Sequence, residues 1–356
     1  MSNPDLDRIK EFVFHVFHQL EGAVVSGMIY LGAQLGLYKA LYGAGAVTSA
    51  ELAKKTGLNE RWLREWLRGQ AAAKLIDYKG DDRFEMGAEA AMVLAIEESP
   101  AYAAGGFTGL PSQFDVLRLL PESFRTGIGL SYDAFGHEGN RGVEQMFAPW
   151  FRTMLVPLAL PALDGVVPKL EQGAKVADVG CGAGVALIEM AKVFPRSEFH
   201  GYDIAKFALA QAETNKREAK VNNVTFHDAS GDAMPADGSF DFVTTFDCLH
   251  DMTRPDLVTR AIRASLKQDG TWLIADINSK PSFEENLERN PMVAMMFGFS
   301  VMSCMSSALS EPGGLGLGTL GFTEDVARQM TSGAGFTRFK RHDFENPLNA
   351  YYEVRP

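Results

Sequence analysis

The sequence has few cysteines and no excess of positive charge. Among 356 residues there are three cysteines, Cys181, Cys248 and Cys304, which lie far apart and form no C-x-x-C pair. This spacing indicates neither a disulfide framework nor a structural zinc site. Basic residues number 34 against 45 acidic ones, which gives a formal net charge of -11. So acidic a chain disfavours phosphate contact, and we expect neither nucleic acid nor an anionic membrane as a main partner.

Long hydrophobic runs are also missing. No stretch reaches the roughly 18 uncharged apolar residues that a membrane-spanning helix needs. The first residues, MSNPDLDRIKEF, are charged where a signal peptide would turn apolar, so we expect a cytoplasmic protein. With 46% hydrophobic and 22% charged residues, the chain can bury a sizeable core and is long enough for two domains.

The first hundred residues are predicted to be mainly helical. Apolar residues recur at spacings of three and four between Asp5 and Leu41. Thr48 or Ser49 can cap a short helix that ends at Gly57, and Asn59 can begin a second one. LIDY and RFEM, joined by KGDD, then predict a hairpin. Helix, turn, helix and hairpin in this order form a winged helix.

The charge of the winged-helix segment is nearly balanced. Residues 48–86 hold eight basic and seven acidic side chains, a net charge of +1. Such a charge is too small for a strong DNA-binding face.

From about residue 171 onward, strands alternate with helices. Strands are predicted at VADVG, EFHGYD, VTFHDA, FDFVTTF and TWLIADI, with helices over 185–193, 207–219 and 256–266. This alternation is typical of a doubly wound, mostly parallel α/β sheet with helices on both faces. We therefore expect an N-terminal helical domain over residues 1–100, a helical connector over 101–170 and an α/β domain over 171–356.

Three glycines at alternate positions follow the first of these strands, in VADVGCGAG. Gly180, Gly182 and Gly184 can form a tight turn without a ligand, but the next strand ends in Asp203, whose carboxylate reaches the same sheet edge and can accept hydrogen bonds from ribose. Val185 stands where a dinucleotide fingerprint has its third glycine, and the loop offers no cation for a pyrophosphate. A nucleoside with a short zwitterionic tail is therefore the better ligand.

These residues resemble the class I S-adenosylmethionine-dependent methyltransferases, with VADVGCGAG as the first motif. The stretches NERWLREWL, FDCLHDM, CMSSAL and GLGTLG extend the resemblance over most of the chain, to bacterial small-molecule methyltransferases with an N-terminal winged-helix domain. The resemblance implies a Rossmann-like sheet, S-adenosyl-L-methionine as the cofactor and a homodimer formed through the apolar helices of the N-terminal domain.

The resemblance also assigns residues to the cofactor. Gly180, Cys181 and Gly182 would surround its methionine part, Asp203 would hold the ribose, and Ile204 would pack on the adenine. Cys181 is given no chemistry of its own, because a small residue suffices in this loop.

Two further parts of the cofactor site follow from the same resemblance. Phe246 and Asp247 would border the methionine amino group. Family members usually have an acid at the end of the third strand, facing the adenine amino group. Counting back from the fourth strand places Ser230 and Gly231 there, with Asp228 and Asp232 on either side.

A candidate base lies in TTFDCLHDM. His250 follows the fourth strand, at the carboxyl edge where doubly wound sheets bind ligands, and histidine readily takes a proton near neutral pH. Plant-type O-methyltransferases use a histidine in a similar L-H-D-W stretch and an acid at the end of the fifth strand, where Asp276 falls here. The resemblance implies His250 as the base, oriented by Asp276. Alternatively, His250 only caps a helix or packs under the cofactor, and alignment drives the reaction.

A metal-dependent mechanism is a weaker alternative. Catechol-type methyltransferases bind magnesium through acids after the fourth and fifth strands, here Asp247, Asp276 and Asn278. The adjacent Asp-Asn pair of that group is absent, and the winged-helix domain belongs to the metal-free group, so we expect no metal.

The composition of one segment indicates the kind of molecule that accepts the methyl group. Residues 290–311, NPMVAMMFGFSVMSCMSSALSE, are apolar on all sides, which predicts a buried helix, a dimer contact or a plastic wall over an acceptor pocket. The glycines of GGLGLGTLG would let a lid open. We expect O-methylation of a small, largely apolar molecule. The alternative is a winged-helix transcriptional regulator whose inactive methyltransferase-like domain senses the nucleoside.

Overall fold

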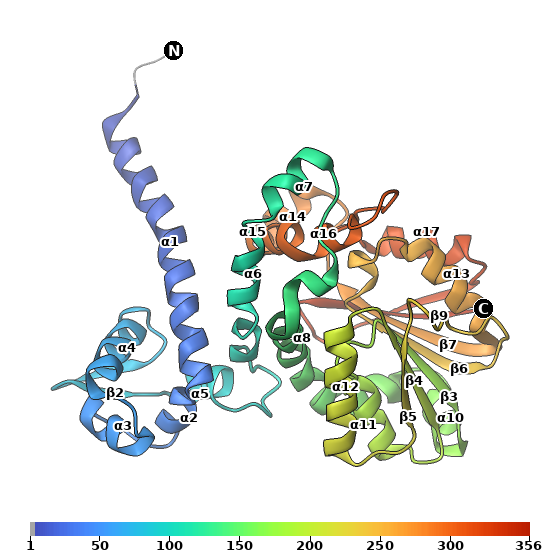
Figure 1. Ribbon diagram of the computed structural model, residues 1–356, viewed down its shortest axis with the longest axis horizontal. Coiled ribbons are helices and arrows are strands. Elements are labelled where there is room, and N and C mark those ends of the chain that lie inside the picture. The colour runs from blue at the N-terminus through green and yellow to red at the C-terminus, as the bar shows by residue number, and fades with distance from the viewer. Residues whose placement is uncertain (1–3) are drawn as a thin grey trace. The chain divides into compact units, whose positions relative to one another are not determined.

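The chain folds into two units in a computed structural model that describes residues 4–356 (Figure 1). The N-terminal unit runs up to Pro111 and includes Gln145–Pro149, and the C-terminal unit comprises Ser112–Glu144 and Trp150–Pro356. The predicted connector, residues 101–170, is thus divided between the two units.

The N-terminal unit begins with a long helix, α1 (Leu6–Gln34). Asp5 caps this helix by accepting hydrogen bonds from the backbone N–H groups of Asp7 and Arg8. Phe14 and Phe17 on its surface are 71% and 62% exposed. By length and composition α1 is long and apolar enough to cross a membrane, a property that the sequence analysis did not anticipate.

A winged helix follows, as predicted. Thr48 caps α3 (Ser49–Thr56) in a reciprocal capping box with Glu51, and Gly57 ends it with a positive φ of 74°. Asn59 caps the next helix by accepting a hydrogen bond from the backbone of Arg61. The elements of this part are α2 (Leu37–Leu41), α3, α4 (Glu60–Ala72), the antiparallel strands β1 (Asp77–Gly80) and β2 (Arg83–Glu85), and α5 (Ala88–Leu94).

Helices fill the chain between the winged helix and the sheet. Two of these helices have a proline in their interior, Pro149 and Pro157, and the second of them is a π-helix over residues 151–159. These elements are η1 (Ala104–Phe107), α6 (Leu110–Val116), α7 (Leu120–Thr126), η2 (Tyr132–Phe135), α8 (Gly136–Trp150), η3 (Phe151–Ala159), α9 (Leu160–Ala162) and α10 (Val166–Gln172).

The C-terminal unit is built on a seven-stranded sheet of order β5-β4-β3-β6-β7-β9-β8. Neighbouring strands from β5 to β7 pair in parallel, whereas β9 runs antiparallel to both of its neighbours. The five predicted strands are confirmed, and the antiparallel pair at the edge was missed. The strands are β3 (Lys175–Val179), β4 (Glu198–Asp203), β5 (Val224–Asp228), β6 (Phe240–Phe246), β7 (Leu266–Ile277), β8 (Arg338–His342) and β9 (Asn349–Arg355).

Two apolar layers cover the sheet. Alternate residues of β3 point to opposite faces, with Val176 in a core that includes Leu187 of α11 (Val185–Val193) and Ala177 in a core that includes Ile262 of α13 (Pro255–Ser265). Both faces are therefore buried, as a doubly wound sheet requires. The crossover between β4 and β5 contains one more helix of the sheet layers, α12 (Lys206–Ala219). The short helix η4 (Leu249–Asp251) follows β6.

A helical insertion lies between β7 and the last helix, α17 (Glu324–Gly333). Residues 290–311, predicted as one apolar helix, form three consecutive helical pieces after α14. Met296 in this segment is buried, while Met295 and Phe297 are exposed. After α14 (Phe283–Arg289), the three pieces are α15 (Val293–Phe299), the π-helix η5 (Ser300–Cys304) and α16 (Met305–Ala308).

The core of the winged helix gives the first prediction. Leu67 on α4 is fully buried, whereas Trp62 on the same helix is 80% exposed. Leu67→Ala should lower the free energy of unfolding of the N-terminal unit by about 2–5 kcal/mol, because it leaves a cavity. Trp62→Ala should change it by less than about 0.5 kcal/mol. Urea denaturation followed by circular dichroism measures both, and equal losses would contradict this account of the core.

Candidate functional site

The glycine loop after β3 is held against the end of β4. The backbone N–H groups of Gly180 and Cys181 donate to the carbonyl of Tyr202, at 2.8 and 3.2 Å. A Cβ atom at Gly180 would lie 2.7 Å from the sulfur of Cys248, and the φ of +74° at this position also requires glycine. At Gly182, with φ +53°, a Cβ would meet nothing within 4 Å. Gly180 thus permits packing inside the protein, and Gly182 leaves room for a ligand.

Asp203 ends β4 and faces this loop. Its carboxylate accepts hydrogen bonds from the backbone N–H of Gly182 at 2.7 Å and of Ala205 at 2.8 Å. Desolvation raises the pKa of Asp203 in spite of these hydrogen bonds, which lower it. The neighbouring Ile204 is 61% exposed, so it offers an apolar surface beside the carboxylate.

The end of β5 differs from the prediction. Counting placed Ser230 at the end of the third strand, but the strand ends at Asp228, which pairs in register with Asp203. An acid therefore does stand at this position, and the count was wrong by two residues because no helix or turn signal fixed the length of the following loop. The hydroxyl and backbone N–H of Ser230 both donate to Asp228, and Gly231 is exposed beside them.

Phe246 and Asp247 end β6. Asp247 has a positive φ of +49°, which is uncommon for a residue other than glycine. Residues in such strained backbone conformations are concentrated at functional sites. Its carboxylate accepts a hydrogen bond from the side chain of Asn349, a residue that the sequence analysis missed because it lies on the unpredicted strand β9. Burial and the charge of Asp276 raise the pKa of Asp247 to about 8. Phe246 packs edge-on against Phe151.

The two predicted catalytic residues lie together. Nδ1 of His250 is 2.7 Å from Oδ1 of Asp276, and the two residues are only 3% and 1% exposed. Because Nδ1 is engaged by the carboxylate, Nε2 is the nitrogen left for another partner. Burial lowers the pKa of His250, but Asp276 and Cys304 raise it, and the net pKa lies well above the usual value.

Buried acids surround this pair. Burial raises the pKa of Asp178 and of Asp251 to about 7. Asp178 accepts a hydrogen bond from the hydroxyl of Thr244 at 2.7 Å. The sequence analysis passed over Asp178 although it stands inside VADVG, and passed over Asp251 although it follows His250 directly.

Five carboxyl groups at this edge have no lysine or arginine to offset them. Within residues 4–356, Asp178, Asp203, Asp247, Asp251 and Asp276 form no ion pair with either residue type. Uncompensated buried carboxylates are unfavourable, and a cationic ligand would remove that penalty. The open side of Gly182, the oriented Asp203 and this negative charge fit a nucleoside that carries positive charge.

Two segments enclose the site. In the glycine-rich stretch predicted as a lid, the backbone N–H of Gly318 donates to the carbonyl of His250 at 3.0 Å, and Leu315 donates to Thr253 at 2.9 Å. Tyr132 of η2 lies on another side, close to Asp251 and to Asp203. The part of the chain that the structure describes contains no group of three or more His, Cys, Asp or Glu residues arranged to hold a metal ion.

Comparison with known families agrees with both units. The model of a family described as a methyltransferase domain matches residues 170–316, and that of the Rv2258c-like winged HTH domain matches residues 23–95. Together the two matches account for more than half of the chain.

Relatives in sequence resemble only part of the chain. The ubiquinone biosynthesis O-methyltransferase of Albidiferax ferrireducens is 32% identical over 127 residues, which are 35% of this chain and 49% of that protein. The enzyme of the same name from Paracidovorax citrulli is 32% identical over 124 residues, 34% of this chain and 50% of that protein. The chain therefore spans about half the length of the curated relatives it matches.

Solved structures resemble the whole chain. Human N-acetylserotonin methyltransferase, in complex with SAM, superposes with a TM-score of 0.68 at 16% identity, over 100% of this chain and 99% of that one. An O-methyltransferase family protein from Burkholderia thailandensis gives 0.67 at 17% identity, over 99% of each chain. At such identities these likenesses show the fold alone, and the family rests on the two matched domains. The chain belongs to the class I S-adenosylmethionine-dependent methyltransferases that carry an N-terminal winged-helix domain.

Proposed function

We propose that this protein transfers the methyl group of S-adenosylmethionine to a hydroxyl oxygen of a small, largely apolar molecule, with His250 as the general base. The observation that carries the proposal is the buried hydrogen bond between His250 and Asp276, at 2.7 Å, on the sheet edge that also holds the glycine loop and Asp203. The names of the sequence relatives, O-methyltransferases of ubiquinone biosynthesis, agree with an oxygen acceptor.

The cofactor would bind along the carboxyl edge of the sheet. Asp203 would accept hydrogen bonds from the ribose hydroxyls, and Gly182 would leave the backbone open to the methionine part. Ile204 and the end of β5, with Ser230 and Gly231, would border the adenine. When bound, the cofactor supplies an electrophilic methyl group on a positively charged sulfur. The buried carboxyls favour that positive charge in their ionised form, and the charge would in turn lower their raised pKa values, that of Asp247 included.

The base would act through one nitrogen. The hydrogen bond to Asp276 keeps the proton of the neutral imidazole on Nδ1, so the lone pair of Nε2 is available for the proton of the acceptor hydroxyl. The carboxylate also stabilises the imidazolium that results. Burial of both side chains excludes water, which limits competing proton exchange.

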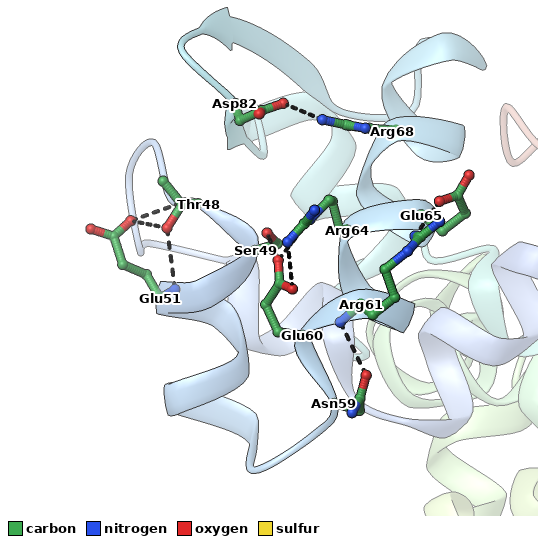
Figure 2. Close-up of polar contacts among 10 residues, drawn as sticks. All are labelled: Thr48, Ser49, Glu51, Asn59, Glu60, Arg61, Arg64, Glu65, Arg68 and Asp82. Carbon is green, nitrogen blue, oxygen red and sulfur yellow. Dashed lines mark hydrogen bonds and ion pairs between the residues drawn. The ribbon is translucent and has the colours of Figure 1, made fainter.

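The regulator alternative fits the winged helix poorly. A DNA-reading helix needs free cations for phosphates and bases, but the arginines of α4 are engaged within the domain (Figure 2). Their partners are Glu65 for Arg61, Glu60 for Arg64 at 2.7 Å, and Asp82 for Arg68 at 2.8 Å. This charge balance supports a structural role for the winged helix.

A second copy of the chain would cover α1. Phe14 and Phe17 lie three residues apart, on neighbouring positions of the helix surface, and both are largely exposed. A homodimer would bury this surface in the cytoplasm, where we place the protein, without a membrane. The winged-helix unit would then serve as the dimerisation domain.

The ribose contact predicts the effect of replacing Asp203. Asp203→Asn should weaken binding of S-adenosylhomocysteine at least tenfold, because hydrogen bonds to a charged group are worth about 1.5–3 kcal/mol each. Isothermal titration calorimetry measures the affinity. The exposed Asp325 at the start of α17 provides the control, and Asp325→Asn should bind as the unaltered protein does. Unchanged affinity in Asp203→Asn would remove the assignment.

The base predicts a loss of rate without a loss of cofactor binding. His250→Ala should lower kcat by about 10²–10⁴-fold and leave the affinity for S-adenosylhomocysteine nearly unchanged. His137→Ala, at an exposed histidine, is the control. Activity should rise with pH as His250 loses its proton. Because Asp276 raises the pKa of His250, Asp276→Asn should move this rise to lower pH as well as reduce the maximal rate. Full activity in His250→Ala would leave alignment as the mechanism.

If α1 forms the dimer interface, charged substitutions on it should halve the mass of the particle in solution. Phe14→Glu combined with Phe17→Glu should convert a particle of twice the chain mass into one of the chain mass, because two charges on the buried surface oppose association. Size-exclusion chromatography with light scattering reports the mass. Leu257→Glu, at a half-exposed leucine of α13, should remain dimeric. A monomeric unaltered protein, or a dimeric double variant, would refute the role of α1.

A further inference from the structure

A cavity of about 320 Å³ opens beside the helical insertion of the C-terminal unit. It lies between α14, the segment from α15 to α16, and residues 317–321 of the glycine-rich stretch. Its volume is within the range of small-molecule sites. The walls include six apolar side chains, Phe283, Phe297, Val301, Met305, Leu317 and Leu320.

The cavity adjoins the proposed catalytic centre through two wall residues. Met305 directly follows Cys304, the neighbour of His250. Leu317 directly precedes Gly318, whose backbone N–H donates to the carbonyl of His250. The helices η5 and α16, which supply part of the cavity wall, also contact η4, which carries His250.

One wall of the cavity is aromatic and partly open. The rings of Phe283 and Phe297 have their centroids 5.8 Å apart and are tilted by 55°, and both side chains are exposed at their outer edges. Exposed aromatic surface of this kind gains from burial against a flat apolar ligand. Met305 can adapt its shape to the ligand on the opposite side.

Lys280 brings an uncompensated positive charge to this apolar cavity. Among residues 4–356 it forms no ion pair, and the nearest partner of its ammonium is Oδ1 of Asn278, at 3.4 Å. That same oxygen also accepts a hydrogen bond from Arg341 at 3.2 Å, so it is shared between two cations. In a chain of net charge -11, a lysine left without an acidic partner at a cavity wall is available for an anion.

The backbone of Lys280 is fixed by a buried amide. The side chain of Asn286 accepts a hydrogen bond from the N–H of Lys280 at 3.0 Å and donates to the carbonyls of Lys280 and Ser282, at 2.9 and 2.7 Å. Asn286 is itself buried and lines the cavity. The start of the lysine side chain is thus held at the cavity, which reduces the entropy lost when an anion binds.

We propose that the acceptor is an apolar hydroxy acid, whose hydrocarbon body fills this cavity and whose carboxylate pairs with Lys280. The inference rests on the proposed function, which it deepens by naming the substrate class. The hydroxyl would point toward His250, so the carboxylate and the hydroxyl of the acceptor would lie at opposite ends of its hydrocarbon body.

The test compares two probes that share a ring system and a hydroxyl. Fluorescence titration measures binding of 6-hydroxy-2-naphthoate, whose hydroxyl and carboxylate lie at opposite ends of the ring system, and of 2-naphthol in the presence of saturating S-adenosylhomocysteine. The unaltered protein should bind the naphthoate roughly tenfold more tightly than the naphthol, because only the former offers a charge-assisted hydrogen bond to Lys280. Lys280→Met should abolish this preference and leave the affinity for 2-naphthol unchanged. Lys280→Arg should keep the preference.

A matched control separates this site from general charge. Lys340 is exposed on β8, and Lys340→Met removes the same charge from the chain without touching the cavity. It should retain the tenfold preference. The proposal is overturned if the unaltered protein shows no preference, or if Lys280→Met keeps it.

Methyl transfer is assayed separately, so that the two proposals can fail independently. A preference that depends on Lys280, with no methylation of any hydroxylated probe, would support the anion site and count against the proposed reaction. Methylation of 2-naphthol and of the naphthoate at equal efficiency in every variant would support the reaction and overturn the role of Lys280.

Discussion

The candidate site depends on buried carboxyl groups that form no ion pair with lysine or arginine among residues 4–356. Parallel strands place Asp178, Asp203, Asp247 and Asp276 at one edge of the sheet, and η4 adds Asp251. Raised pKa values at several of these groups express the cost of their burial. In the proposed function, a positively charged sulfur would be bound here more favourably than its neutral product.

The doubly wound topology explains why residues far apart in the sequence meet there. Each crossover returns the chain to the same side, so that all parallel strands end at a common edge. Asp203 at the end of β4 accepts a hydrogen bond from Gly182, which follows the neighbouring strand β3. Asp276 at the end of β7 pairs with His250, which follows the neighbouring strand β6. In the glycine-rich stretch after α16, the backbone N–H of Gly318 donates to the carbonyl of His250. This hydrogen bond connects the helical insertion to the sheet edge. Function thus arises from strand order more than from any single motif.

The winged helix and the sheet edge of the C-terminal unit differ in how their charged side chains are paired. In the winged helix, each arginine of α4 has an acid as its partner, so the positive charges on this helix are offset (Figure 2). At the sheet edge of the C-terminal unit, the five buried aspartates form no ion pair with lysine or arginine, and Lys280 forms none with an acid, among residues 4–356. An unpaired charge near apolar side chains is unfavourable. A charge that a fold nevertheless keeps unpaired is therefore a candidate for a binding or catalytic role.

Sequence alone determined the class of this protein, because strand alternation, the spacing from Gly184 to Asp203 and the caps at Thr48 and Asn59 are local signals. It also assigned His250 and Asp276, through resemblance, to a pair that the structure brings into hydrogen-bond contact. Only the tertiary structure could locate the strand end at Asp228, bring in Asn349 from an antiparallel edge strand, and set Lys280 beside a cavity. These features depend on loop lengths and on contacts between distant segments, which leave no periodic signature in the chain.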